Sequence, residues 1–327
     1  MARPLALALH AHPLVLSIVP PPARAAPSRL STSLDATLGL VERRSRVDAI
    51  SVPELIDENH DGRPFYRTAD PRAYAAALAL GARREVVVTK VVAHLPDEAA
   101  VSSWAEETVR LGLRHVVLVG GSSRYIPYPG PPVAAANGVV RPVLAGAGGL
   151  LGNIAIPQRT GEAHRMLAKT RAGASFFTTQ LLFDPSGILD LLRRYDRLCR
   201  DAGVPPAAVL VSVAPVGDEA DASFVRWLGA DLPEEVERAI LEPEGHDISA
   251  RSVQNARELW SAVRAAVVEQ GLSVPVGVNV EQLSARHLGA AEQLVEALEP
   301  ELERPSSASD ELGGGTAHPE PPRARTA

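Results

Sequence analysis

Short apolar runs rich in β-branched residues recur along the chain, and helical patterns separate most of them. Eight such runs lie near residues 14–19, 47–52, 85–92, 115–119, 153–156, 175–182, 209–214 and 274–280. Runs of this length and composition are typical of strands that are buried on both faces. Strands that alternate with helices form a parallel sheet, and eight of them in about 300 residues predict a (β/α)8 TIM barrel. We expect this barrel to span residues 1–300.

Several of the intervening helices have clear start and stop signals. Asp97 precedes a helix whose apolar positions recur at helical spacing until Gly112. Asp184 and Pro185 open another helix, as its N-cap and its first helical residue. A third helix is expected over residues 249–271, where apolar side chains again follow the helical period.

Residues 152–184 carry the most detailed pattern, which is strand, helix, strand. Thr160 is expected to cap the helix and Gly173 to close it. The second strand is buried and carries Thr178, Thr179 and Gln180 near its C-terminal end. Three hydrogen-bonding side chains at the end of a buried strand exceed what packing requires. The unit therefore predicts a ligand-binding barrel.

The alternative architecture is an open, doubly wound sheet. That fold carries a glycine-rich phosphate loop directly after a strand. Here the glycine-rich segment at residues 146–149 precedes a strand, and Leu151 stands where the third glycine should be. We expect the segment to be a flexible loop.

Composition and charge exclude several classes of protein. The chain has 327 residues, 22% of them charged, with a net charge of −6 and no basic stripe with interleaved aromatic residues. We therefore expect no nucleic-acid partner. No apolar run reaches the roughly 18 residues needed to cross a bilayer, so no membrane association is expected. The apolar stretch after residue 5 is interrupted by His10, His12 and Pro13, and it predicts a first strand in a cytoplasmic protein better than a signal peptide.

The single cysteine and the C-terminal segment add two further expectations. Cys199 excludes an internal disulfide and any metal site built from several cysteines, and it lies on an apolar helical face where a buried side chain is expected. From about Pro305 the chain turns to Ser, Gly, Pro and Arg with few apolar side chains, and residues 301–327 are expected to form a disordered tail.

In a barrel of this kind the functional site lies at the C-terminal ends of the strands. Amides and acids dominate the residues expected there, and no nucleophile lies beside a base. The set comprises Ser17, Glu54, Asp57, Glu58, His94, Gly120, Gly121, Ser122, Gln158, Arg159, Gln180, Asp184, Asp218, Asn279, Glu281 and Gln282. Because His10 and His12 lie at the wrong end, no metal site is predicted. A glutamine amide both donates and accepts hydrogen bonds, so this set suits a flat heterocycle with several N–H and C=O groups.

Four segments resemble the methylenetetrahydrofolate reductase family. They are LSIVPP at residues 16–21, VLVGGS at 117–122, AGASFFTTQLLFD at 172–184 and, more weakly, VSVAPV at 211–216. The similarity extends loosely from residue 14 to about residue 298. It implies a (β/α)8 barrel that reduces 5,10-methylenetetrahydrofolate to 5-methyltetrahydrofolate in one-carbon metabolism. The resemblance also implies that Gln180 contacts the pterin of this folate substrate.

Two departures from the family pattern affect side chains that take part in the family's reaction. The first strand carries Ser17, or Ile18 in a shifted register, where the family has an acidic glutamate. The fourth strand ends in Gly120, Gly121 and Ser122, where the family has Arg-Gly-Asp. A serine hydroxyl is far too weak an acid to replace a carboxyl group. With its LSIVPP segment and the acidic residues 57–61, the chain is more similar to a flavin-independent actinobacterial branch, which passes hydride directly from NADH or NADPH.

The missing acid can be replaced from a neighbouring strand. In a closed barrel the eighth strand pairs with the first, so Glu281, which shares a face with Asn279, can reach the space beside Ser17. The second strand offers Glu54 and Glu58, which are otherwise solvated loop acids. We predict Glu281, Glu58 and Ser17 as the catalytic residues.

The remaining candidates fall into substrate-binding and cofactor-binding sets. The substrate set is Gln180, Asn279, Gln282 and Ser122, and the cofactor set is Gly120, Gly121, Arg124, Tyr125 and Gln158. The glycines can present backbone N–H groups to a phosphate, although such a segment is first of all a turn. The cofactor is expected to be NADH or NADPH, with FAD as a less favoured alternative. A non-catalytic descendant that binds a pterin or a partner protein is the other function considered, because two working carboxylates are absent.

Overall fold

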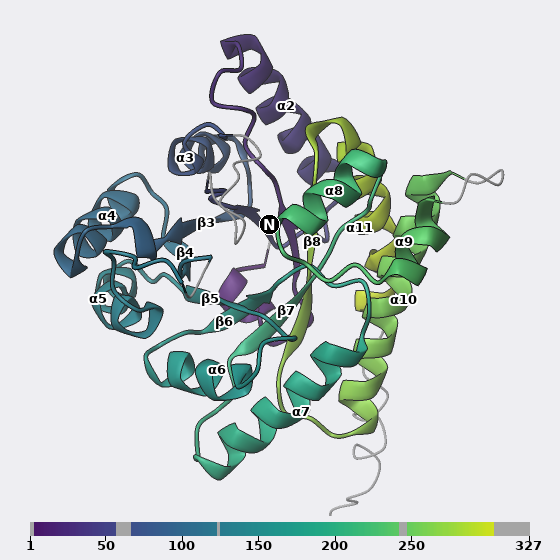
Figure 1. Ribbon diagram of the computed structural model, residues 1–327. Coiled ribbons are helices and arrows are strands. Elements are labelled where there is room, and N and C mark those ends of the chain that lie inside the picture. The colour runs from purple at the N-terminus through teal and green to yellow at the C-terminus, as the bar shows by residue number, and fades with distance from the viewer. Residues whose placement is uncertain (1–2, 57–66, 123–124, 242–246, 304–327) are drawn as a thin grey trace, which may run out of the picture.

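Eight parallel strands form a closed barrel at the centre of the molecule. The computed structural model describes residues 3–56, 67–122, 125–241 and 247–303. Each strand pairs with its neighbour in chain order, and β8 pairs with β1 to close the ring. Figure 1 shows the strands at the centre with the helices around them. The closed ring confirms the (β/α)8 barrel and excludes the open sheet.

The eight strands are short and almost entirely buried. They are β1 (Leu14–Ser17), β2 (Ala49–Val52), β3 (Glu85–Val91), β4 (His115–Val119), β5 (Leu151–Ala155), β6 (Phe176–Thr179), β7 (Ala208–Val213) and β8 (Val276–Glu281). All eight coincide with runs expected from the sequence, with ends that differ by up to three residues. The expected first strand is confirmed as β1.

The helices follow the strands around the outside of the barrel. They are α2 (Pro27–Arg43), α3 (Pro71–Gly81), α4 (Glu98–Arg110), α5 (Val133–Gly146), α6 (Glu162–Arg171), α7 (Ser186–Asp201), α10 (Ile248–Glu269) and α11 (Leu288–Glu303). Two shorter helices, α8 (Glu219–Trp227) and α9 (Glu234–Leu241), precede α10 between β7 and β8. Short 3-10 helices η1 (Val92–His94) and η2 (Ala285–His287) follow β3 and β8. None of the described helices is long and apolar enough to cross a membrane.

The N-cap predictions succeed in one place and fail in two, whereas Gly112 and Gly173 follow the C-caps of α4 and α6 as expected. Asp97 caps α4, where its carboxylate accepts a hydrogen bond from the Ala100 N–H at 2.8 Å. The cap predicted at Thr160 is wrong, because Gly161 is the N-cap of α6 and its backbone has a φ of +75°, a region that favours glycine. The start of α7 is displaced by one residue. Pro185 is its N-cap, while Asp184 accepts from the Ser186 N–H at 2.9 Å.

The glycine-rich segment at residues 146–149 is not a loose loop. Gly146 is the last residue of α5, and the N–H of Gly149 donates to the Leu144 carbonyl at 2.8 Å. A Cβ on Gly149 would lie 1.9 Å from the Arg114 carbonyl oxygen. The glycine therefore allows a close backbone approach where the chain enters β5.

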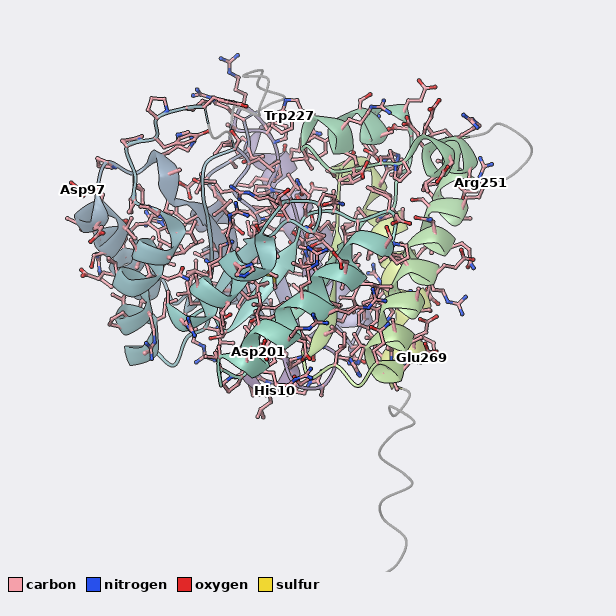
Figure 2. The ribbon with its side chains drawn as sticks, turned by 60° about the horizontal axis from the view of Figure 1, so that its bottom comes forward. His10, Asp97, Asp201, Trp227, Arg251 and Glu269 are labelled. Carbon is pink, nitrogen blue, oxygen red and sulfur yellow. The ribbon has the colours of Figure 1, made fainter. Side chains whose placement is uncertain are left out.

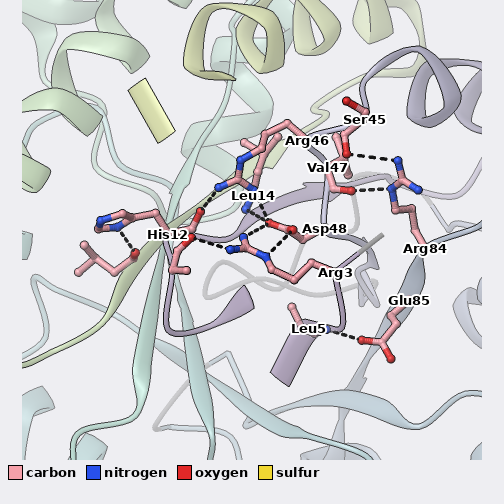
Figure 3. Close-up of polar contacts among 12 residues, drawn as sticks. Arg3, Leu5, His12, Leu14, Ser45, Arg46, Val47, Asp48, Arg84 and Glu85 are labelled. Atoms are coloured by element: carbon pink, nitrogen blue, oxygen red, sulfur yellow. Dashed lines mark hydrogen bonds and ion pairs between the residues drawn. The ribbon is translucent and has the colours of Figure 1, made fainter. Parts of the chain in front are cut away.

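A short helix, α1 (Leu5–Ala8), closes the N-terminal end of the barrel. Leu5 and Ala8 are buried against the inward side chains Val15, Val87 and other members of the interior cluster. The N–H of Leu5 donates to a carboxylate oxygen of Glu85 at 2.6 Å (Figure 3). This apolar plug fills the lower half of the barrel, so any ligand site must lie at the other end.

The segment before β1 is held by a buried carboxylate, Asp48. One oxygen of Asp48 accepts from Arg3 at 3.0 Å, from Arg46 at 2.7 Å and from the Leu14 N–H at 2.9 Å. Arg46 also donates to the His12 carbonyl at 2.7 Å, as Figure 3 shows. Because charge-assisted bonds of this kind are the stronger ones, the network fixes where β1 enters the barrel.

The C-terminal boundary of the barrel lies later than expected. The helix α11 runs to Glu303, and Glu301 accepts hydrogen bonds from Arg257 at 2.7 Å and from Ser261 at 2.6 Å. Residues 301–303 are therefore helical, which corrects the boundary predicted after residue 300. The remainder of the predicted tail, residues 304–327, lies outside the described residues. Cys199 is buried in α7, as expected.

Candidate functional site

The upper half of the barrel interior is polar. Successive side chains of a strand point to opposite faces. The residues two places after the inward residues that pack on α1, such as Val15 and Val87, therefore also point into the barrel. Six of them are small or amide side chains that are less than 9% exposed: Ser17, Ser51, Thr89, Thr178, Ser212 and Asn279. These positions lie toward the C-terminal ends of the strands, which we call the mouth. Figure 2 places Trp227 near this end and His10 at the opposite one.

Glu281 is the carboxylate of this polar layer. It ends β8 and is paired in register with Ser17 of β1, as expected from the closure of the barrel. The Asn279 amide donates to Glu281 Oε1 at 3.0 Å and to Ser212 Oγ at 3.0 Å. Three side chains from β7 and β8 are thus linked into one hydrogen-bonded group beside Ser17.

The surroundings of Glu281 favour its protonated form. Burial raises the pKa of Glu281 to about 7, although hydrogen bonds from Ser212 and Asn279 act in the opposite direction. No cation in the described part of the chain forms an ion pair with this carboxyl. A carboxylic acid that keeps its proton near neutral pH can serve as a general acid.

Two amide oxygens on or directly after β8 lack a hydrogen-bond partner among the described residues. Asn279 Oδ1 and Gln282 Oε1 are buried and accept no hydrogen bond from any residue in the described ranges. Gln282 is held in place by its backbone, whose N–H donates to the Ser17 carbonyl at 2.9 Å. Buried polar atoms are satisfied in most proteins, so these two acceptors suit the N–H groups of a ligand or of ordered water.

Glu54, the other described acid considered for proton transfer, is not part of this group. Glu54 is not a solvated loop charge, because its two oxygens accept from Lys90 at 2.6 Å and from the Val91 N–H at 2.5 Å. Glu58 lies outside the described residues.

Gln180 lies directly after β6, and its amide is already engaged. Its Nε2 donates to the carbonyl of Leu228, the C-cap of α8, at 2.9 Å, and its Oε1 accepts from the Leu181 N–H at 3.2 Å. The side chain therefore anchors the end of α8 over the mouth. One N–H and one lone pair remain for a ligand.

The segment after β4 is occupied by its own loop. A Cβ on Gly121 would lie 2.1 Å from the Tyr128 ring, and Ser122 Oγ lies 3.0 Å from the Tyr128 hydroxyl. Tyr128 thus accounts for the glycine at 121 and covers its backbone. Tyr125 is 79% exposed at the same end, whereas Arg124 lies outside the described residues.

The other predicted cofactor residues are placed less centrally. Gly120 packs toward Val133, 3.4 Å from where its Cβ would lie. Gln158 lies in the turn after β5, near the first turn of α7, where a Cβ on Gly187 would be 4.0 Å from its Nε2. Gly120, Gly121 and Gln158 therefore follow β4 and β5, whereas the Glu281 group is carried by β7 and β8.

A second polar cluster near the mouth was not predicted. Asp221 accepts from the Gly217 N–H at 2.9 Å and lies 2.6 Å from His287 Nδ1, while Asp218 caps α8. The ligand atoms of Asp218, Asp221 and His287 all lie within 4.8 Å of one another. These contacts join the start of α8 to the segment after β8, which accounts for the cluster. Asp218 was among the residues expected at the mouth, but its grouping with Asp221 and His287 could not be foreseen, because Asp221 and His287 are 66 residues apart.

Comparison with known proteins adds similarity at the level of fold. No protein-family model matches the chain, and no curated protein matches it by sequence. An uncharacterized protein from Clostridium thermocellum that binds two copies of 5-methyl-5,6,7,8-tetrahydrofolic acid is similar in structure. Its TM-score is 0.74 at 17% identity, over 90% of this chain and 98% of that one.

A second solved structure is less similar. It is the oxygenating constituent of 3,6-diketocamphane monooxygenase from Pseudomonas putida in complex with FMN. Its TM-score is 0.53 at 12% identity, over 89% of this chain and 98% of that one. At 17% and 12% identity, these similarities show a shared barrel fold.

Proposed function

We propose that this chain reduces 5,10-methylenetetrahydrofolate to 5-methyltetrahydrofolate, with NADH or NADPH as the hydride source and Glu281 as the proton donor. The observation that carries the proposal is the carboxyl of Glu281, which is held by Asn279 at the mouth, lies opposite Ser17 and has no cationic partner in the described ranges. In this proposal Glu281, from the neighbouring strand, takes the role of the glutamate that the resembled family carries on its first strand.

Three further observations support a reduced folate as the substrate. The unpartnered oxygens of Asn279 and Gln282 can accept hydrogen bonds from the N–H groups of a pterin. The segment at residues 172–184 resembles the pterin-contacting strand of the reductase family. The Clostridium thermocellum neighbour binds a methylated tetrahydrofolate.

The proposed reaction begins with a proton transfer. Glu281 donates its proton to N10 of the folate, the bond between N10 and the bridging carbon breaks, and the electron pair of N5 forms an iminium with that carbon. Hydride addition to the carbon then gives the methyl group. With a pKa near 7, Glu281 carries the proton in the physiological range. The polar layer positions the folate for both steps.

The hydride donor is proposed to lie over the mouth. A nicotinamide supplies the hydride when bound, and the exposed ring of Tyr125 can stack on a planar group of such a cofactor. The backbone of Gly121 does not fit a phosphate, because Tyr128 packs against it. We favour direct hydride transfer because the LSIVPP segment and the acidic residues 57–61 resemble the flavin-independent branch. The flavin route remains the alternative to be separated by experiment, since the Pseudomonas putida neighbour holds FMN.

The test is an assay of the purified protein with methylenetetrahydrofolate and NADH or NADPH, with and without added FAD. Turnover by colourless protein without FAD is the expected result. Glu281→Gln should lower turnover by at least about 10²-fold, the usual scale for a general acid. The matched control is Glu219→Gln, which removes an exposed acid of α8 at the same end of the barrel and should leave turnover unchanged.

The same assay separates the non-catalytic alternative. The observation that favours this alternative is that Ser17 and Ser122 stand where the resembled family has working carboxylates. Colourless protein that binds 5-methyltetrahydrofolate in calorimetry but oxidises neither NADH nor NADPH would replace the reductase by a folate-binding protein. If the protein is yellow and its turnover requires FAD, the reaction uses the flavin route in place of direct hydride transfer.

A further inference from the structure

The side-chain nitrogen of Asn279 uses both of its hydrogens inside the barrel. It donates one to Ser212 Oγ and the other to Glu281 Oε1, each at 3.0 Å. The register of β7 and β8 pairs Ser212 with Asn279, and the two side chains are 0% and 3% exposed. Because an amide nitrogen carries only two hydrogens, Asn279 Nδ2 has none left for a ligand.

Ser212 completes a triangle with Asn279 and Glu281. Its hydroxyl also forms a hydrogen bond with the Glu281 carboxyl. A serine hydroxyl has a single hydrogen and an ionised carboxyl can only accept, so that hydrogen points at Glu281. Ser212 Oγ then has only lone pairs to offer to Asn279. The amide must therefore present Nδ2, and not Oδ1, to Ser212, so the hydroxyl decides which way round the amide lies.

The orientation of the amide selects the oxygen of Glu281 that carries the proton. Oε1 accepts a hydrogen bond from Asn279 Nδ2, and the oxygen of a carboxylic acid that accepts from an N–H group is normally its carbonyl oxygen. The proton of Glu281 is therefore held on Oε2. An amide turned the other way would present Oδ1 to Glu281 and would draw the proton into a hydrogen bond with Asn279.

The same orientation accounts for the unpartnered oxygen of Asn279. Oδ1 is buried and has no hydrogen-bond partner among the described residues, because both partners of the amide lie on its nitrogen side. A ligand N–H can therefore pair with Oδ1 while the acid proton stays available on Oε2 of Glu281.

The neighbouring strands bring hydroxyl groups, and not charges, to Glu281. β1 contributes Ser17, which is paired in register with Glu281, and β7 contributes Ser212. Within the described ranges, burial and the hydrogen bonds of Ser212 and Asn279 set the pKa of Glu281, and no charged side chain acts on it. A change at Ser212 therefore reaches Glu281 without an ionic intermediary.

Resting on the proposed function, we propose that Ser212 is a positioning residue for the proton transfer. It fixes the Asn279 amide, and the amide keeps the acid proton on Oε2 of Glu281 and its own oxygen free for the substrate. Ser212 acts through these two side chains, so its loss is expected to change both the acidity of Glu281 and the rate of the reaction.

The experiment measures the titration of Glu281 directly, by NMR on protein labelled with carbon-13 at the glutamate side-chain carboxyls. The resonance of Glu281 is assigned by its loss in Glu281→Gln. Ser212→Ala removes the hydroxyl, and Ser212→Cys keeps a side chain of similar size with a much weaker hydrogen bond. The matched control is Ser252→Ala, which removes an equally buried hydroxyl of α10 and its hydrogen bond from the Val216 N–H at 2.7 Å. The pH profile of kcat/KM is recorded for wild type and these three serine variants.

Wild type and Ser252→Ala should share a titration midpoint near pH 7. In Ser212→Ala the midpoint should rise by about one pH unit, because the ionised carboxyl loses a hydrogen bond that the protonated form needs less. Below both midpoints, where Glu281 is fully protonated, kcat/KM of Ser212→Ala should still be about tenfold lower, the scale of one lost hydrogen bond. Ser212→Cys should lie between wild type and Ser212→Ala in both measurements.

A midpoint that stays at the wild-type value in both Ser212 variants would overturn the positioning role, whether or not the protein reduces a folate. A full wild-type rate of Ser212→Ala below the midpoints would also overturn it. If the midpoints shift as expected but wild type shows no turnover, the proposed function is overturned, and with it the part of Ser212 in a proton transfer.

Discussion

The raised pKa of Glu281 predicts a pH-dependent cost to stability that a single substitution removes. In the unfolded chain the carboxyl titrates near its ordinary 4.5, whereas in the folded protein its pKa is about 7. Between these two values the unfolded state has lost the proton and the folded state keeps it, so stability falls as pH rises. Below 4.5 both states are protonated and stability is not reduced; above 7 both are ionised and the loss of stability is complete.

The magnitude follows from the same two values. At 1.36 kcal/mol per pKa unit, a rise from 4.5 to about 7 corresponds to roughly 3 kcal/mol of lost stability above pH 7. Glu281→Gln keeps the shape of the protonated side chain and its hydrogen bond with Asn279, but it cannot ionise. Relative to wild type, the variant should gain roughly 3 kcal/mol between pH 5 and pH 8.5.

Urea unfolding at a series of pH values measures this difference. The free energy of unfolding of Glu281→Gln is compared with that of wild type and with that of Glu219→Gln, whose acid is exposed. The control should track wild type at every pH. If the free energy of unfolding of wild type ran parallel to that of Glu281→Gln across the pH range, the conclusion that Glu281 is buried and keeps its proton would be refuted.

Four further outcomes are expected from other parts of the structure. The kcat/KM for methylenetetrahydrofolate should fall as pH rises through about 7, since the acid form of Glu281 is the active one, and a flat pH profile would count against it. Leu5→Ala, in the fully buried plug, should lower the free energy of unfolding by about 2–5 kcal/mol in urea. Asp48→Asn should cost about 3 kcal/mol by the same measurement, because two arginines lose their partner, and a cost below about 1 kcal/mol would contradict the network. Gln180→Ala should speed hydrogen exchange in α8, whose last turn loses the bond to the Leu228 carbonyl, while protection in β3 stays as in wild type.

The strands could be predicted because they are buried on both faces and read as continuous apolar runs. The run at 115–119 coincides with β4, and the ends of the others differ by up to three residues in either direction, because the apolar pattern does not mark which residues are paired. Local cap chemistry was less predictable. Thr160 is a good capping residue by type, but Gly161 adopts the left-handed conformation that starts α6. Four-residue α1 is too short to give a helical period, so the barrel plug was not foreseen.

The candidate site divides in the same way. The pairing of Ser17 with Glu281 follows from strand parity and barrel closure, both of which the sequence carries. The polar layer could not be predicted. A single serine in an apolar run, such as Ser51 or Ser212, gives the same sequence pattern whether it points inward or outward. The bond between Gln180 and Leu228 joins residues 48 positions apart, and only the folded chain brings them together.

Direct hydride transfer aided by Glu281 is the central claim, and isotope transfer tests it most directly. Purified protein without flavin is incubated with methylenetetrahydrofolate and NADH or NADPH deuterated at the transferring position of C4. The methyl group of the product is then analysed by mass spectrometry. We predict one deuterium in the methyl group for wild type and product formation at least about 10²-fold slower for Glu281→Gln. Absence of product, or product whose methyl group carries solvent hydrogen in place of deuterium, would contradict the account.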